Sequence, residues 1–204
     1  YYFSSGDCMK NEEKILSIVN EKGYIMSKDL SKKNINAYYL SKLVKENKLV
    51  RVSRGYYVLP NGFPDNFYII LSKCKKAVFS HATALYLHNL SERCPLVYDI
   101  TVPYGYGNCY KNSKNVNLHY QKLETMNVGI IEIDSPFGMK IKVYDTERTI
   151  CDIIKNKNKM DIEIFSQALK KYANSSDKDL NKLMRYAKKL KIENKVREYM
   201  EVVL

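Results

Sequence analysis

The chain has 204 residues and a formal net charge of +12, with 18 tyrosines and no tryptophan. A small DNA-binding module needs only about 60 residues, so the length predicts a second hydrophobic core. No apolar stretch approaches the roughly 18 residues of a membrane span, and we expect no membrane partner. The basic charge favours a polyanionic partner, which composition alone leaves open as DNA, RNA or an acidic protein.

The cysteines predict a reducing compartment. Their number is odd, they are widely spaced, and they form no C-x-x-C pair with matching histidines. We therefore expect free thiols in a cytoplasmic protein, without a metal site and without a cofactor. The five residues are Cys8, Cys74, Cys94, Cys109 and Cys151.

The first eight residues, 1–8, precede Met9 and resemble a vector-derived leader. They are left out of the predicted fold, and residues 9–60 predict the first domain. Apolar residues at helical spacing indicate a helix that ends at Gly23. Ser27 is placed to cap a short second helix, and a third helix is expected over residues 36–47.

A β-hairpin is predicted at the end of this domain. Apolar residues alternate on both sides of the turn Ser53-Arg54-Gly55, and its glycine allows a positive φ. Two helices joined by a turn and followed by a basic hairpin are typical of a winged helix-turn-helix. The third helix then occupies the position of the recognition helix.

Outward positions of this domain carry the groups that a DNA-binding protein needs. Residues 9–60 have a net charge of +6 and residues 61–204 one of +7, so positive charge is denser in the first domain. Basic side chains neutralise phosphates, while asparagine, tyrosine and serine hydrogen-bond to base edges or backbone. A lysine-rich helix can also be only a solvated face, and winged helices also bind proteins. The predicted DNA-binding residues are Lys28, Lys32, Lys33, Asn36, Tyr38, Tyr39, Ser41, Lys42, Lys45, Arg51, Ser53 and Arg54.

Residues 61–204 predict a separate α+β domain, because two prolines and an Asn-Gly pair mark the junction after Pro60. The strands follow one another closely, so antiparallel hairpins are expected. The predicted class is α+β, with a small, mainly antiparallel sheet and terminal helices. Strands are predicted over 98–102, 115–121, 128–134 and 139–144, and helices over 64–75, after Ser80, after Asp145, and near 161–173, 177–190 and 193–203.

Three stretches resemble a known family. They are the winged unit ending in RGYYVL at residues 54–59, the segment FSHATALYLHNLS at 79–91, and VYDTERTICD at 143–152. In this order and spacing they are similar to AbiE-type antitoxins of type IV toxin–antitoxin and abortive-infection systems. The resemblance covers nearly the whole chain from Met9, whereas residues 105–114 match no particular branch of the family.

The resemblance implies a non-enzymatic phage-defence antitoxin and transcriptional regulator. Such a protein represses its own promoter through the N-terminal domain. It neutralises a nucleotidyltransferase-like toxin through the C-terminal domain, without a need for stable toxin binding. The candidate residues for toxin neutralisation lie in the second and third stretches and are Ser80, His81, Thr83, Arg148 and Asp152.

These residues also have simpler structural interpretations. Ser80 fits the N-cap of a helix better than a nucleophile, because adjacent residues at a helix start point in different directions. His81 and His88 are two helical turns apart, too far for a pair of metal ligands. Arg148 and Asp152 are i,i+4 neighbours that can form an ion pair behind a cap at Asp145.

Two further interpretations of the second domain remain. One is an enzyme with nucleotidyl- or phosphoryl-transfer activity, although the chain has no P-loop and no Gly-Ser pair followed by paired aspartates. The other concerns Gly105 and Gly107, whose loop is rich in tyrosine. A Gly-x-Gly pair alone is a weak signal for phosphate binding or base stacking, and a mobile surface loop is the simpler expectation.

Overall fold

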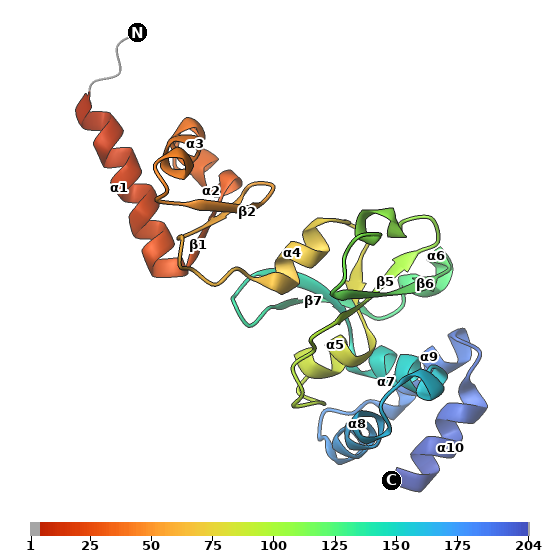
Figure 1. The fold of residues 1–204 in the computed structure, drawn as a ribbon. Coiled ribbons are helices and arrows are strands. Elements are labelled where there is room, and N and C mark those ends of the chain that lie inside the picture. The colour runs from red at the N-terminus through yellow and green to blue at the C-terminus, as the bar shows by residue number, and fades with distance from the viewer. Residues whose placement is uncertain (1–4, 204) are drawn as a thin grey trace. The chain divides into compact units, whose positions relative to one another are not determined.

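The computed structural model describes residues 5–203, which form two compact units that divide between Ser72 and Lys73 (Figure 1). The sequence predicted that the second domain begins at residue 61. In the structure the division lies further along the chain, and the helix Asn66–Ser72 belongs to the first unit. Residues 1–4 of the expected leader lie outside the described residues, while residues 5–8 already belong to the first helix. No helix within 5–203 is both long and apolar enough to cross a bilayer.

The first unit contains the predicted helix-turn-helix and hairpin in the predicted order. Its three strands form an antiparallel sheet in the order β1-β3-β2. Ile15 and Val19 of the first helix pack with Leu40 and Leu43 of the third in one buried cluster. The elements are α1 (Ser5–Lys22), β1 (Tyr24–Met26), α2 (Ser27–Ser31), α3 (Tyr38–Lys45), β2 (Val50–Ser53), β3 (Tyr56–Val58) and α4 (Asn66–Ser72).

Two helix starts differ from the prediction. Helix α2 begins at Ser27 itself, and the Met26 N–H at the cap position donates to the Asp29 carboxylate at 3.3 Å. Helix α3 starts at Tyr38 rather than Asn36, and the Tyr38 N–H donates to Asn36 Oδ1 at 2.8 Å. In both cases a short carboxylate or amide side chain supplies an acceptor for a backbone N–H that lacks an intrahelical partner.

The second unit has the predicted α+β class. Figure 1 shows its last four helices gathered at one end of the unit, beside the sheet. The elements are β4 (Val78–Phe79), α5 (His81–Leu87), β5 (Tyr98–Pro103), η1 (Gly107–Tyr110), β6 (Val116–Gln121), α6 (Leu123–Met126), β7 (Ile130–Asp134), β8 (Lys140–Tyr144), α7 (Thr146–Lys155), η2 (Lys157–Lys159), α8 (Ile162–Asn174), α9 (Leu180–Lys189) and α10 (Glu193–Val203).

The sheet of this unit is mixed, with the order β6-β5-β4-β8-β7. Strands β7 and β8 form the antiparallel hairpin that the sequence predicted, and β4 pairs antiparallel with β5. The pairs β5/β6 and β4/β8 are parallel, so the expectation of hairpins throughout is wrong for β5 and β6. The connection through η1 explains the difference, because a dozen residues are enough for a crossover back to the start of the neighbouring strand.

The helical end of the second unit is built around α7. Ile150, Ile153 and Ile154 are buried there among apolar side chains of α8, α9 and α10, including Phe165 and Leu183. The cap predicted at Asp145 is confirmed, since its carboxylate accepts the Arg148 N–H at 2.9 Å. The thiols whose side chains are described, Cys74, Cys94, Cys109 and Cys151, are free, as expected.

Candidate nucleic-acid interface

Helix α3 presents a polar face to solvent and an apolar face to the core. Tyr38 is 64% exposed, and Ser41 and Lys45 are exposed as well. Leu40 and Leu43 are buried on the other side. The helix is therefore anchored through its apolar face, and its outer face is accessible to solvent.

Tyr39 does not belong to this outer face. Its side chain is only 7% exposed and packs in the apolar cluster of the first unit. The reason is helical spacing, since residue 39 lies four positions before Leu43 and shares its face. The expectation that Tyr39 faces outward is wrong, and the neighbouring Tyr38 ring, 5.9 Å away, is the exposed one.

Lys42 is half-buried and held in place by carboxylates. Its Nζ lies 2.6 Å from Glu12 Oε1 on α1 and 3.8 Å from Glu46 Oε1 on the turn after α3. A phosphate would have to compete with Glu12 for this ammonium group. The Lys42–Glu46 spacing of i,i+4 was visible in the sequence, whereas the Glu12 contact depends on how α1 packs.

The wing carries two exposed arginines, Arg51 and Arg54. Gly55 has a φ of +72° and allows the tight turn beside them. Ser53 differs from its neighbours, because its Oγ is buried and has no hydrogen-bond partner within the described part of the chain. The expectation of a DNA contact through the Ser53 hydroxyl is therefore wrong, whereas both arginines are accessible.

The remaining predicted contacts lie on α2 and on the loop that follows. Lys28, Lys32, Lys33 and Asn36 are all exposed. Asn36 Oδ1 already accepts the Tyr38 N–H, so its amide NH₂ is the group left for a ligand.

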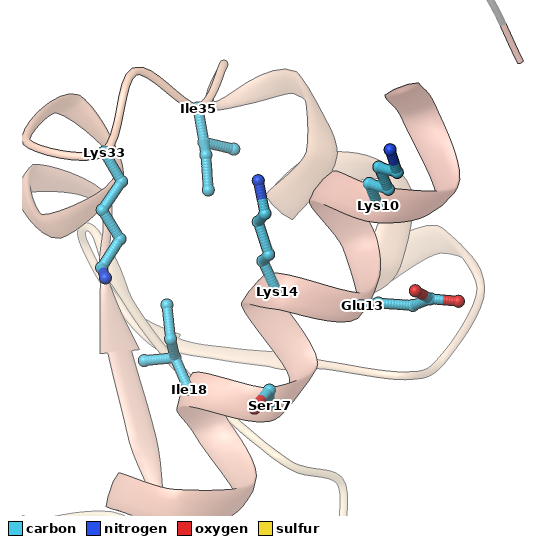
Figure 2. A pocket seen from close by; sticks show the side chains of 7 residues that line it. All are labelled: Lys10, Glu13, Lys14, Ser17, Ile18, Lys33 and Ile35. Atoms are coloured by element: carbon cyan, nitrogen blue, oxygen red, sulfur yellow. The ribbon is translucent and has the colours of Figure 1, made fainter. Parts of the chain in front are cut away.

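Beside this loop lies a groove of about 670 Å³ that the sequence did not indicate. Figure 2 shows Lys10 and Lys14 extending from α1 and Lys33 from the loop opposite. Ile18 and Ile35 form the apolar part of its lining. Lys10 and Lys14 thus extend the basic surface of the first unit beyond the predicted residues.

In the second unit, the five candidate residues for toxin neutralisation are buried. Ser80, Thr83, Arg148 and Asp152 are fully buried and His81 is 3% exposed. None of them can contact a partner directly in this conformation. Their contacts are with the rest of the unit.

Arg148 connects three segments of the chain. Its Nε donates to both carboxylate oxygens of Asp152 at 3.1 Å, which confirms the predicted i,i+4 pair. One terminal nitrogen donates to the carbonyls of Thr125 at 2.6 Å and Val128 at 2.9 Å. The guanidinium lies 4.2 Å from the ring centroid of Tyr144. Burial raises the pKa of Asp152, while the Arg148 charge opposes that shift.

Ser80 occupies the N-cap position of α5, but its side chain does not cap the helix. Instead, the Thr101 hydroxyl donates to Ser80 Oγ at 2.9 Å, and His81 Nδ1 lies 3.0 Å from the same oxygen. The Thr83 hydroxyl accepts the Asp99 N–H at 2.8 Å. The predicted side-chain cap is therefore wrong, because these hydroxyl groups join α5 to β5.

His81 is the centre of a buried polar cluster. Its ring stacks on His119 with a centroid distance of 3.6 Å, and its Nε2 lies 2.9 Å from the Asn156 amide nitrogen. His119 Nε2 in turn lies 2.7 Å from Asp99 Oδ1. His81 also has a φ of +47°, which is strained for a residue with a side chain. Burial lowers the pKa of His81 well below its ordinary value, and His119 lowers it further.

The winged unit matches a known family model over part of the chain. Residues 13–60 match the family described as "Transcriptional regulator, AbiEi antitoxin". This match confirms, over the winged helix, the resemblance to AbiE-type antitoxins that the sequence motifs indicated. No curated protein matches the chain in sequence.

One solved structure is similar in fold to most of the chain, including the second unit, which the AbiEi match does not reach. The crystal structure of the RV2827C protein from Mycobacterium tuberculosis has a TM-score of 0.57 to this chain. The two are 12% identical, and the alignment covers 88% of this chain and 71% of that one. At this identity the similarity concerns the fold alone.

Proposed function

We propose that the protein is a transcriptional repressor and antitoxin that binds duplex DNA of its own promoter through the first unit. The observation that carries this proposal is the exposed surface of α3 and the wing. There Tyr38 and Ser41 offer hydrogen-bonding groups, and Lys45, Arg51 and Arg54 offer charge. The AbiEi match over residues 13–60 supports the same interpretation.

In this proposal, α3 lies in the major groove and the wing contacts the adjacent backbone or minor groove. Tyr38, Ser41 and the free amide of Asn36 reach base edges. Lys45 and Arg51 neutralise phosphates, and Arg54 extends from the wing. Lys42 contributes less than its position suggests, because Glu12 and Glu46 already compensate its charge.

The antitoxin part of the proposal concerns the second unit. We assign it the neutralisation of a nucleotidyltransferase-like toxin in the cytoplasm, without a need for a stable complex. The stretches 79–91 and 143–152 support this by their resemblance to AbiE-type antitoxins. Ser80, His81, Thr83, Arg148 and Asp152 then act by maintaining the shape of the unit, because all five are buried.

The decisive experiment compares binding of the full chain to its own upstream DNA and to scrambled duplex of equal length, across a salt series. We expect a preference of about 10³-fold or more, near the low end for sequence-specific DNA-binding proteins. Equal, weak and steeply salt-dependent binding to both duplexes would contradict specific repression and leave only a general affinity for polyanions.

A further inference from the structure

A group of exposed tyrosines lies at one edge of the second unit. Tyr104 follows β5, Tyr106 lies in the next turn and Tyr120 is near the end of β6; their side chains are 65%, 45% and 44% exposed. We call these three residues the tyrosine platform. The rings of Tyr104 and Tyr120 are nearly parallel, with an angle of 17° and a centroid distance of 5.9 Å. The solvent-exposed arrangement leaves planar aromatic surface uncovered.

The fold holds this platform in place. Tyr120 stands opposite Val102 in the parallel β5/β6 register, and the Tyr104 N–H donates to the Gln121 carbonyl at 3.3 Å. Gly107 packs against Tyr120 so closely that a Cβ there would overlap the tyrosine hydroxyl. The platform is thus formed by two paired strands and a glycine that permits the close contact.

A basic pocket of about 250 Å³ adjoins the platform. Lys75, Lys76 and Lys142 line it together with Asn127. The pocket meets the platform at Tyr106, because the pocket residue Lys76 contacts that tyrosine. The apolar residues that complete the lining are Val78, Pro103, Leu123, Met126 and Ile130.

Lys76 links the two features directly. Its Nζ donates to the Tyr106 hydroxyl at 3.0 Å and lies 4.3 Å from the centroid of that ring. Carboxylates are also present, since Glu132 is the cross-strand neighbour of Lys142 and Glu124 lies on α6. The three lysines of the pocket nevertheless outnumber these two acidic residues, so the local charge favours an anion.

We propose that the tyrosine platform and this pocket bind an unpaired segment of a single-stranded nucleic acid. A base would stack on Tyr104 or Tyr120, and Lys75, Lys76 and Lys142 would hold the adjacent phosphate. Exposed aromatic rings beside lysines suit a strand whose bases are free to stack, whereas duplex DNA keeps its bases stacked inside. This activity is separate from the duplex binding assigned to the first unit.

Fluorescence anisotropy on the full chain tests the proposal, with labelled single-stranded oligouridine and oligothymidine of about twelve nucleotides as probes. We expect Tyr104→Ala and Tyr120→Ala each to weaken binding about tenfold, because stacking contributes strongly for each base. Tyr120→Phe should keep wild-type affinity, since the ring remains. Phe137→Ala is the matched control, because it removes another exposed aromatic ring from the same unit, in the β7–β8 turn.

Salt dependence separates stacking from charge. The tyrosine variants should leave the salt slope unchanged, whereas Lys75→Ala with Lys76→Ala should reduce it. A preference for oligouridine would indicate contacts to the 2′-hydroxyl. Equal binding of oligouridine and oligothymidine would indicate that stacking and charge alone hold the strand. Both results support the site. Wild-type affinity in both Tyr104→Ala and Tyr120→Ala would overturn it, as would an equal loss in Phe137→Ala.

A variant of the first unit makes this test independent of the repressor proposal. Lys45→Ala with Arg54→Ala should weaken binding to all duplexes by about tenfold or more and leave single-strand binding within about twofold of wild type. If single-strand binding disappeared in that variant while the tyrosine variants retained it, the strand would be bound by the winged helix and the platform assignment would be wrong.

Discussion

At the scale of single residues, charge and hydrogen bonding on α3 and the wing have different consequences for DNA binding. Lys45 and Arg54 are exposed, and among the described side chains no carboxylate holds Lys45 at the short distance seen for Lys42. Replacing both with alanine should weaken binding to all duplexes by about tenfold or more and reduce the salt slope by about two, as expected for two lost phosphate contacts. Titrations at several salt concentrations measure both effects. Lys170→Ala, which changes an exposed lysine of α8 in the second unit, serves as the control.

Two adjacent tyrosines provide a second comparison at this scale. Tyr39→Ala removes a buried ring and should destabilise the first unit by about 3 kcal/mol. Tyr38→Ala should change stability by about 0.5 kcal/mol or less, because the ring is mostly exposed, while altering DNA sequence preference. Urea unfolding followed by circular dichroism measures the first effect, and operator binding measures the second. Equal stability of the two variants would contradict the assigned orientation of α3.

At the scale of elements, helices were easier to predict than strand pairing. Apolar spacing predicted α1, α7, α8, α9 and α10, because a helix is a local pattern. The central strand β4 was missed, since Val78 and Phe79 are too few to show an alternation. The parallel pairing of β5 with β6 was also missed, because pairing depends on a crossover that has no local signal.

In the candidate site, too, local patterns could be predicted from the sequence, whereas contacts between distant segments could not. The sequence correctly predicted that Lys45, Arg51 and Arg54 face solvent, because charged side chains at outward helical and turn positions are a local pattern. Tyr39 was misplaced because the face of a residue near a helix start depends on where the helix begins. The partners of His81, namely His119 and Asn156, come from β6 and the end of α7, and no motif links them to α5.

The Arg148–Asp152 pair allows a prediction about how α7 is joined to the sheet. Arg148→Met should destabilise the second unit by about 3 kcal/mol or more, because it leaves the Asp152 carboxylate buried without its partner. Adding Asp152→Leu should restore part of this loss. Recovery should be incomplete, since the Thr125 and Val128 carbonyls still lack their donor. Urea unfolding of the wild type, both single variants and the double variant measures the coupling.

At the scale of the whole molecule, each unit has its own core, and the chemistry proposed for them differs. The first unit presents a helix and a hairpin to a duplex. The second unit buries its distinctive motif residues and exposes tyrosines and lysines at the edge of its sheet. If both proposals hold, the chain binds two forms of nucleic acid through separate surfaces, and the variants described above distinguish them.

The buried His81 makes the second unit sensitive to acid. Its folded-state pKa is well below the ordinary value near 6.5, whereas the unfolded chain has the ordinary value. The unfolded state therefore binds the proton more readily, and stability should fall as the pH decreases from about 7 through 6 towards the folded pKa. Protection of the α5 and β5 amides, measured by hydrogen-exchange mass spectrometry as the exchange rate relative to the intrinsic rate at each pH, should fall over this range.

Asparagine at position 81 isolates this effect, because it keeps hydrogen-bonding groups near Ser80 and Asn156 and accommodates positive φ better than most residues. The His81→Asn variant should show a smaller loss of amide protection between pH 7 and 5.5 than the wild type. The neighbouring His119 and Asp99 remain unchanged in this variant. An identical pH dependence in variant and wild type would show that His81 does not carry the acid sensitivity.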